Sequence, residues 1–404
     1  MPWKVASQTG ERTRFVLRAL KTTESFAQLC RSFGISRRVG YKWLCRFKHG
    51  GRDALADRSR RPRRYPTQVK SPWLQIIRTT RQKHPRWGAK KIRACLLSNR
   101  WKAPVPSVRT IGRFLKRLQL VPRRPQRSRR GPVLLSPPLT RAEAPNEVWT
   151  VDFKGWFRTQ DGDRAEPLTV RDLFSRYILD IQLLPDQREA TVRQAMQRCF
   201  EHYGLPQVIR VDNGPPFGGN GALGLSQLSV WWSRLNIRVE FGRRAHPQDN
   251  AAHEQMHRVL KAETACPPAR TVPEQRKRSE QWRKHYNQQR PHEALNQQVP
   301  ARYYHPSRRH FPDQLPPLHY PTQNWEVRRV HTKGQIKWQG RLRFIGRAFV
   351  GQWIGLKPAG LGQCEIYLGR QLLGVLHQLD PGGMRPAHVH RQVILQKLLP
   401  MSWH

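Results

Sequence analysis

The fold is decided by two stretches, Val148-Trp-Thr-Val-Asp-Phe153 and Val208-Ile-Arg-Val-Asp-Asn213. In the first, the apolar residues Trp149, Val151 and Phe153 alternate with smaller and polar ones, as in a strand that buries one face. The second is a short apolar run that ends in a turn sequence, which is typical of a buried strand.

Further short strands and helices surround these two stretches. The patterns predict strands over 168–173, 177–183 and 237–241, and helices over 187–203 and 249–264, the second capped by Asp249 or Asn250. Strands that alternate with helices indicate an α/β domain with a mixed sheet, which we place at 146–305.

Three carboxylates occupy positions where such a domain builds sites. Asp152 and Asp212 stand at the ends of the two deciding strands, and ligand sites of α/β sheets gather at strand ends. Glu254 lies in the first turn of the helix over 249–264, and it shares a face with Arg258 and Lys261 at spacings of four and seven residues. If the strands are parallel neighbours, the three acids converge.

Convergent carboxylates are what phosphodiester chemistry needs, since two Mg²⁺ ions held by hard oxygen ligands stabilise the attacking and leaving oxygens. Taken singly, the acids have simpler explanations: Asp212 as a turn residue and Glu254 as half of a surface ion pair with Arg258. His246, His253 and His257 have no cysteine near them in zinc-ligand spacing, so we expect a supporting polar role for them and no zinc site.

The charge of the chain points to nucleic acid. The 404 residues contain 74 Lys+Arg and 27 Asp+Glu, a formal net charge of +47, and residues 1–140 hold 36 of the basic and only 4 of the acidic residues. The phosphate backbone is the natural partner for such a surface. The six cysteines form no CxxC pair, no apolar run approaches 18 residues, and the N-terminal residues lack an apolar run, so we expect a reduced, cytoplasmic protein without a membrane anchor.

The first 57 residues predict a helix-turn-helix domain. Gly34-Ile35-Ser36 separates a short helix from a basic one in which Val39, Leu44 and Phe47 are expected to point inward. The outward residues expected to bind DNA are Arg37, Arg38, Lys42 and Arg46.

A second helix-turn-helix domain is expected at 71–120, after a basic linker at 58–70. Its last helix begins near Pro106-Ser107 and is expected to present Arg109, Arg113, Lys116 and Arg117 to DNA. A Pro- and Arg-rich linker follows at 121–145. Near the C-terminus, hairpin signals at Gln339-Gly340 and Gly369-Arg370 predict a small β-barrel over 320–380.

Five ordered blocks resemble a known family. They are Trp149-Thr-Val-Asp-Phe-Lys-Gly155, Arg171-Asp-Leu-Phe-Ser-Arg-Tyr177, Val211-Asp-Asn-Gly-Pro-Pro-Phe217, His246-Pro-Gln-Asp-Asn-Ala-Ala-His-Glu254 and Tyr286-Asn-Gln-Gln-Arg-Pro-His292. Together they resemble the integrase-core transposases of bacterial insertion sequences, DDE enzymes of the retroviral integrase superfamily with an RNase H-like catalytic core. The chain has Ala251-Ala252 and Gln255 where that family usually has Gly before the Glu and a basic residue after it.

The resemblance implies Asp152, Asp212 and Glu254 as the catalytic, metal-binding triad, with two Mg²⁺ ions per site and Mn²⁺ as a substitute. It also implies that the protein binds the terminal inverted repeats of its element, cleaves them and joins them to target DNA within a homo-oligomeric synaptic complex on the nucleoid. Two alternatives remain open: a transposase-derived regulator with weakened catalysis, and a plain RNase H-like nuclease.

Overall fold

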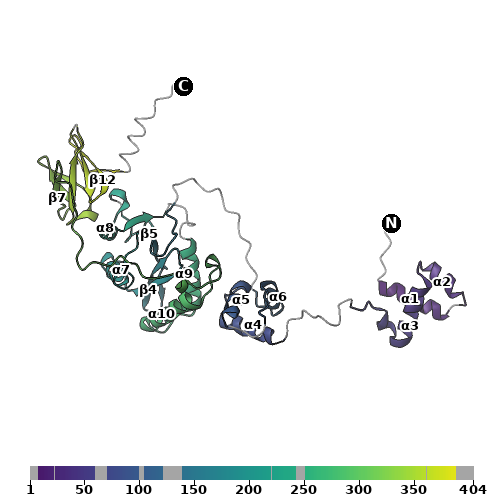
Figure 1. Cartoon of the computed structure of the whole chain (residues 1–404). Helices are drawn as coiled ribbons and strands as arrows, with labels where there is room; N and C mark the ends of the chain where they lie inside the picture. The colour runs from purple at the N-terminus through teal and green to yellow at the C-terminus, as the bar shows by residue number, and fades with distance from the viewer. Residues whose placement is uncertain are drawn as a thin grey trace, which may run out of the picture. The chain divides into compact units, whose positions relative to one another are not determined.

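The computed structural model describes residues 8–21, 23–59, 71–99, 104–121, 139–219, 221–242, 251–360 and 362–387 (Figure 1). The chain forms two compact units, Met1–Lys70 and Ser71–His404, which are treated separately below. His246 and the expected helix caps Asp249 and Asn250 lie outside the described residues. Within the described part, no helix has the length and apolar character needed to cross a bilayer.

The first unit is a three-helix bundle: α1 (Gln8–Lys21), α2 (Phe26–Ser32) and α3 (Arg37–Gly50), followed by a 3-10 turn. Ser36 caps α3, since its side chain accepts a hydrogen bond from the Val39 amide. The expectation that Val39 points inward is wrong: it is 37% exposed, and Gly40 and Trp43 face the core instead. The large Trp43 ring sets which face of α3 is buried, and Gly40 lets the helix pass close to Cys30.

A second helical module opens the other unit, with α4 (Ser71–Lys83), α5 (Ala89–Ser98) and α6 (Val108–Arg117). Ser107 caps α6 through the Thr110 amide. All three helices and the segment between α4 and α5 bury apolar side chains: Trp73, Ile77, Trp87, Ile92, Leu96, Ile111 and Leu115.

A six-stranded mixed sheet forms the next part. Its strands are β1 (Val148–Phe153), β2 (Phe157–Arg158), β3 (Arg164–Asp172), β4 (Ile178–Leu184), β5 (Val208–Val211) and β6 (Arg238–Phe241). Their order is β2-β3-β1-β5-β6, with β4 also paired to β3. β3 is antiparallel to its neighbours β1, β2 and β4, whereas β1, β5 and β6 run parallel.

Helices cover both faces of this sheet (Figure 1). The residues of α7 (Glu189–Tyr203) and α8 (Gln227–Arg234) share a core with Trp149, Val151 and Val170. On the opposite face, α9 (Ala251–Thr264) and α10 (Val272–Gln289) pack through Met256, Leu260, Trp282 and Tyr286 onto β4. The alternation in β1 therefore separates its two faces as its sequence indicates.

The C-terminal strands form two separate sheets, so the expected closed β-barrel is not confirmed. One sheet has the order β13-β12-β11-β10-β7, and a hairpin of β8 and β9 forms the other. Both expected hairpin turns are present, at Gln339-Gly340 and Gly369-Arg370. The strands are β7 (Glu326–Arg329), β8 (Gln335–Trp338), β9 (Arg341–Phe344), β10 (Trp353–Pro358), β11 (Gln363–Leu368), β12 (Gln371–His377) and β13 (Arg385–Pro386).

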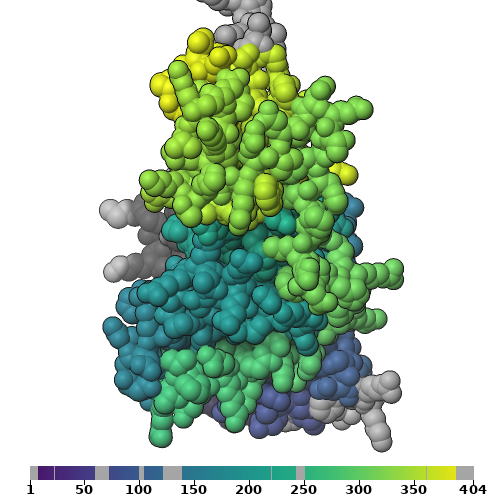
Figure 2. Space-filling model, turned by 90° about the vertical axis from the view of Figure 1, so that its left-hand side faces the viewer, coloured from purple at the N-terminus to yellow at the C-terminus, as the bar shows by residue number. Residues whose placement is uncertain are grey.

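This C-terminal part packs against α8 and the segment before it, which belong to the domain of the six-stranded sheet. Ala222, Leu225 and Val230, which precede or belong to α8, lie in the same buried cluster as residues of the C-terminal strands. Arg234 donates to Gln352 across the junction at 2.8 Å. Figure 2 shows the yellow-green C-terminal surface adjoining the teal surface of the core.

Candidate active site

The pairing of β1 with β5 puts Asp152 and Asp212 on adjacent strands. The parallel register joins Val148 to Val208 and Thr150 to Arg210, a constant offset of 60 residues. Continued by one more pleat, the same offset sets Asp152 opposite Asp212, where side chains of neighbouring parallel strands point to the same face. The sequence spacing of the two acids thus equals the register of the strands that carry them.

Asp152 faces the layer that contains α9. It is directly opposite Thr169 on the antiparallel strand β3, and Thr150 lies on the same face of β1, one pleat away. The Thr169 hydroxyl donates to the backbone carbonyl of Asp152 at 3.0 Å. The backbone of Asp152 is therefore held to β3 by this hydrogen bond in addition to the strand pairing.

Two buried histidines fasten α9 to that face. His253 Nε2 and His257 Nε2 lie 2.6 and 2.7 Å from the Thr169 hydroxyl oxygen. His253 Nδ1 lies 2.8 Å from the Thr150 hydroxyl. Glu254 is next to His253 in the first turn of α9 and is exposed. These contacts hold the start of α9, and with it the backbone of Glu254, over the strand of Asp152.

Counting protons assigns the tautomers. A hydroxyl has one proton and two lone pairs, and Thr169 gives its proton to the Asp152 carbonyl. Its lone pairs must then accept from both histidines, so each carries its proton on Nε2. On this count His253 Nδ1 accepts from Thr150 at 2.8 Å, so the Thr150 proton is shared with the Arg171 carbonyl oxygen at 3.3 Å, and His257 Nδ1 keeps a lone pair.

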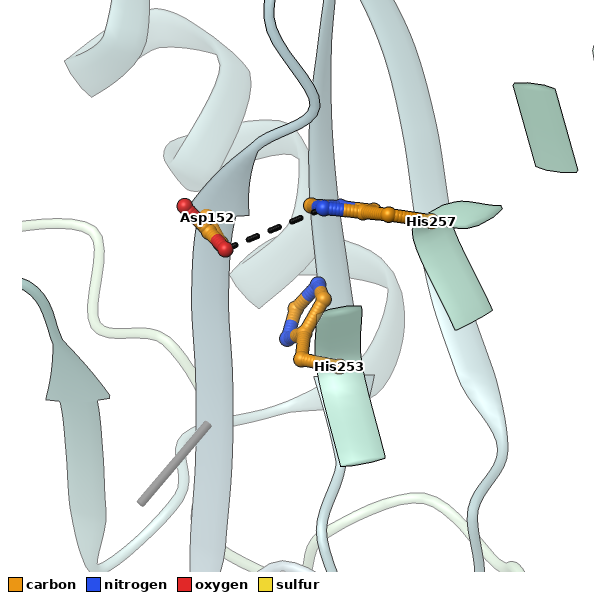
Figure 3. A group of neighbouring side chains, drawn as sticks. All are labelled: Asp152, His253 and His257. Carbon is orange, nitrogen blue, oxygen red and sulfur yellow. Dashed lines mark ion pairs between the residues drawn. The ribbon is translucent and has the colours of Figure 1, made fainter. Parts of the chain in front are cut away.

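His257 Nδ1 lies 3.8 Å from Asp152 Oδ2, the contact drawn dashed in Figure 3. Burial, with Lys154 and Arg171 nearby, lowers the pKa of His257 to about 3, so this contact is not an ion pair at neutral pH. The pKa of His253 is also lowered well below its usual range by burial.

The carboxyl of Asp152 titrates near neutrality. Its pKa is raised to about 7, chiefly by burial and then by the negative charge of Asp212, with a smaller contribution from Glu254. Burial also raises the pKa of Asp212. Asp212 and Glu254 both act on Asp152 because the three acids lie within electrostatic reach of one another.

A nitrogen-rich metal centre does not fit this cluster. Ligand atoms of Asp152, His253 and His257 lie within 4.8 Å of one another. Both ring nitrogens of His253 are already hydrogen bonded, and His257 uses Nε2. Only His257 Nδ1 is left free for a metal, so His253 and His257 serve mainly to hold α9 on the sheet here.

Cations lie beside the acids. The pKa of Lys154 is lowered by burial and by Lys261, and is raised by Asp152, so these two lysines lie near each other at the acidic end of β1. Arg258 and Lys261 are exposed on α9, on the same side as Glu254. Lys154 was not among the residues expected from sequence, although its place two positions after Asp152 was a usable signal.

The cations expected to contact DNA are on the surface of the helical modules. Arg37, Arg38 and Lys42 are exposed on α3, while Arg46 is half-buried over the Trp43 ring. The four expected cations of α6 are all exposed: Arg109, Arg113, Lys116 and Arg117.

Comparison with known families matches most parts of the chain. Residues 142–247 and 235–300 each match an integrase core domain. Residues 11–63 match a helix-turn-helix domain, and residues 39–115 match a homeodomain-like domain. Residues 325–378 match the C-terminal domain of IS481 family transposases.

Two curated relatives come from insertion elements. The insertion element IS407 uncharacterized 31.7 kDa protein of Burkholderia multivorans is 29% identical over 187 residues, 45% of this chain and 63% of that protein. The insertion element IS476 uncharacterized 39.2 kDa protein of Xanthomonas euvesicatoria is 28% identical over 233 residues, 55% of this chain and 61% of that protein. The chain thus spans about three fifths of the length of these relatives.

Among solved structures, the HTLV-2 integrase catalytic core domain in complex with magnesium matches 41% of this chain and 100% of its own, with 15% identity and a TM-score of 0.33. The family matches and the curated relatives agree with the resemblance seen in the five sequence blocks. Parts of the chain thus match an integrase core domain and helix-turn-helix domains, and the two relatives described above are proteins of insertion elements.

Proposed function

We propose that this protein is a DDE transposase that binds the terminal inverted repeats of an insertion sequence and catalyses metal-dependent strand cleavage and strand transfer. The observation that carries the proposal is the parallel pairing of β1 with β5, which end next to Asp152 and Asp212, with Glu254 on a helix bonded to the same face. Asp212 and Glu254 both raise the pKa of Asp152, and such a group of carboxylates is suited to cationic partners.

The donor set fits divalent cations with a preference for oxygen. Asp152, Asp212 and Glu254 offer carboxylate oxygens, while three of the four ring nitrogens of His253 and His257 are occupied by hydrogen bonds. Mg²⁺ is bound by such ligands, and Mn²⁺ accepts them too. When bound, the cations would stabilise charge on the attacking and leaving oxygens of the phosphodiester.

The remaining residues bind and orient DNA. Lys154, Arg258 and Lys261 lie where the phosphates of the reacting strand would pass the acids. The exposed cations of α3 and α6 would hold the element end through phosphate and major-groove contacts. An element has two ends, and each must be cleaved and joined to the target by an active site. The protein would therefore work as a homo-oligomer on DNA in the cytoplasm.

Asp152→Asn tests the assignment. The assay uses full-length protein, Mg²⁺ and a duplex oligonucleotide with the terminal repeat from the DNA that flanks the gene. We expect the variant to lose cleavage and joining while binding the end as tightly as the wild type. Asp163→Asn, an exposed acid in the turn between β2 and β3, is the matched control and should keep both activities. Strand joining by Asp152→Asn would refute the triad.

The wild type itself separates the remaining alternatives. End binding without any cleavage in Mg²⁺ would indicate a regulator that has lost catalysis. Cleavage without joining would indicate a nuclease. Only cleavage followed by joining of the freed 3′-hydroxyl supports a transposase.

A further inference from the structure

Trp156 is, with Trp353, one of two exposed tryptophans in the described part of the chain. It follows Gly155, whose φ of +84° turns the chain after β1, and it is 56% exposed. Trp87, Trp149 and Trp232 are by contrast among the largest fully buried side chains. An exposed indole leaves a large apolar face in water, and such faces mark binding surfaces.

Two arginines border this ring. Arg158 and Arg164 are cross-strand partners on β2 and β3, and their guanidinium carbons lie 5.9 and 5.1 Å from the centroid of the Trp156 ring. Arg12 lies much closer to the Trp43 ring, at 3.9 Å. The arginines at Trp156 therefore surround the ring with positive charge without stacking tightly on it.

The ring shares a cavity with two of the lysines that lie beside the acids. Trp156, Lys154 and Lys261 line one small cavity of about 110 Å³ between the segment that follows β1 and the helix α9. Trp156 is four residues after Asp152. At about 3.3 Å per extended residue, the Cα atoms of the two residues lie at most about 13 Å apart. With bases about 3.4 Å apart along a strand, that span is at most about four nucleotides.

We propose that Trp156 is a stacking platform for an unpaired base of the DNA strand that enters the active site, with Lys154, Lys261, Arg158 and Arg164 holding the phosphates around it. The inference rests on the proposed function and deepens it, because it states which DNA structure the site accepts: an end whose terminal pairs are open. An aromatic face with a cationic border suits single-stranded nucleic acid, since every base has a face that stacks and every linkage has a charge.

Charge complementarity favours DNA over a protein partner. The cations at the ring are exposed, apart from the half-buried Lys154, and the acid beside them, Glu166, is buried and paired with Arg164. The other nearby acids, Asp161 and Asp163, sit in the turn at the tip of the hairpin, where Asp161 accepts a hydrogen bond from Thr159. The strand would thus lie along the base of the hairpin, toward Asp152.

The test compares two DNA probes in EDTA, so that no cleavage takes place. One is a blunt duplex, and the other is the same duplex with four unpaired nucleotides at one end, one of them 2-aminopurine. Full-length wild type is expected to bind the forked probe more tightly and to quench its 2-aminopurine fluorescence. Trp156→Ala should lose about 5- to 100-fold in affinity for the forked probe, with little change for the blunt one.

Two variants keep the result specific. Trp156→Phe retains an aromatic face and should restore most of the fork preference and the quenching. Trp353→Ala removes a tryptophan that is 53% exposed in the C-terminal sheet and should behave as the wild type.

Other outcomes overturn the proposal. Equal binding of both probes by the wild type would do so, as would equal loss on both probes in Trp156→Ala. A change of oligomeric state in Trp156→Ala, with fork preference intact, would assign the ring to a protein contact instead. The assay reads binding alone, so a Trp156-dependent fork preference without cleavage in Mg²⁺ would keep the platform and refute the transposase.

Discussion

Replacing Asp152 by asparagine is expected to stabilise the metal-free fold at alkaline pH, although the same change should abolish catalysis. The carboxyl is 21% exposed and faces a lone pair of His257 Nδ1 and the charges of two other acids. Ionising it without a cation is therefore costly. The asparagine amide has similar shape and no charge, so it removes that cost.

The magnitude follows from the pKa of Asp152, raised from 3.8 to about 7. The native state holds this proton more tightly than the unfolded chain, so its contribution is fully present below the unfolded pKa and is lost as pH rises through the folded pKa. Relative to acidic pH, the raised pKa of Asp152 lowers the free energy of unfolding by about 2 kcal/mol at pH 5 and by about 4 kcal/mol at pH 8. The variant should therefore gain about 2–3 kcal/mol over the wild type between these two pH values.

The assay is urea unfolding of the full chain in EDTA at pH 5 and pH 8, read by pulsed hydrogen exchange. Peptides from β1 and α9 then report the catalytic domain separately from the helical modules. Asp163→Asn serves as the control, because its side chain is exposed in a turn, and it should show no such pH-dependent gain. A difference between Asp152→Asn and wild type that is the same at both pH values would refute the reasoning.

Three further predictions concern metal, hydrogen bonds and packing. Mg²⁺ at about 100 times its Kd should raise the stability of the wild type at pH 8 by about 2.7 kcal/mol in the same urea assay and that of Asp152→Asn by much less; equal effects would place the ion elsewhere. Thr169→Val leaves two buried imidazole N–H groups without an acceptor and should lower the free energy of unfolding by about 2–5 kcal/mol, whereas Thr169→Ser should lose only about 1 kcal/mol. Gly40→Ala places a Cβ 2.7 Å from Cys30 Sγ and should destabilise the first unit by about 1–3 kcal/mol in thermal unfolding. Gly112→Ala, another helical glycine whose Cβ would meet only Ala89 at 3.9 Å, should stabilise by up to about 1 kcal/mol; a loss there would contradict the packing described.

The strands of the catalytic sheet were predictable because they are apolar and end in recognisable turns. The expected strands over 148–153 and 208–211 coincide with β1 and β5. The helix α10 was missed, and its sequence explains why. The residues that it buries at helical spacing include Gln275 and Ser279 beside Trp282 and Tyr286, so counting apolar residues does not reveal its inner face.

The candidate site divides in a similar way. Asp152, Asp212 and Glu254 could be named from strand ends and a helix turn, but their supports could not. Thr169 is one threonine among many in the sequence, and only the pairing of β1 with β3 puts it between Asp152 and two histidines. Long-range pairing of this kind has no local signal, and the exposure of Trp156 had none either.

The junction between α8 and the C-terminal sheets affects how the protein can be dissected. Ala222, Leu225 and Val230 are covered by residues that come more than a hundred positions later in the chain. A fragment that stopped at residue 305 would therefore expose an apolar patch about ten residues after Asp212. We expect such a fragment to aggregate or to hold that segment poorly. Expression trials should keep both portions in one polypeptide, or replace the three apolar residues with hydrophilic ones before separating them.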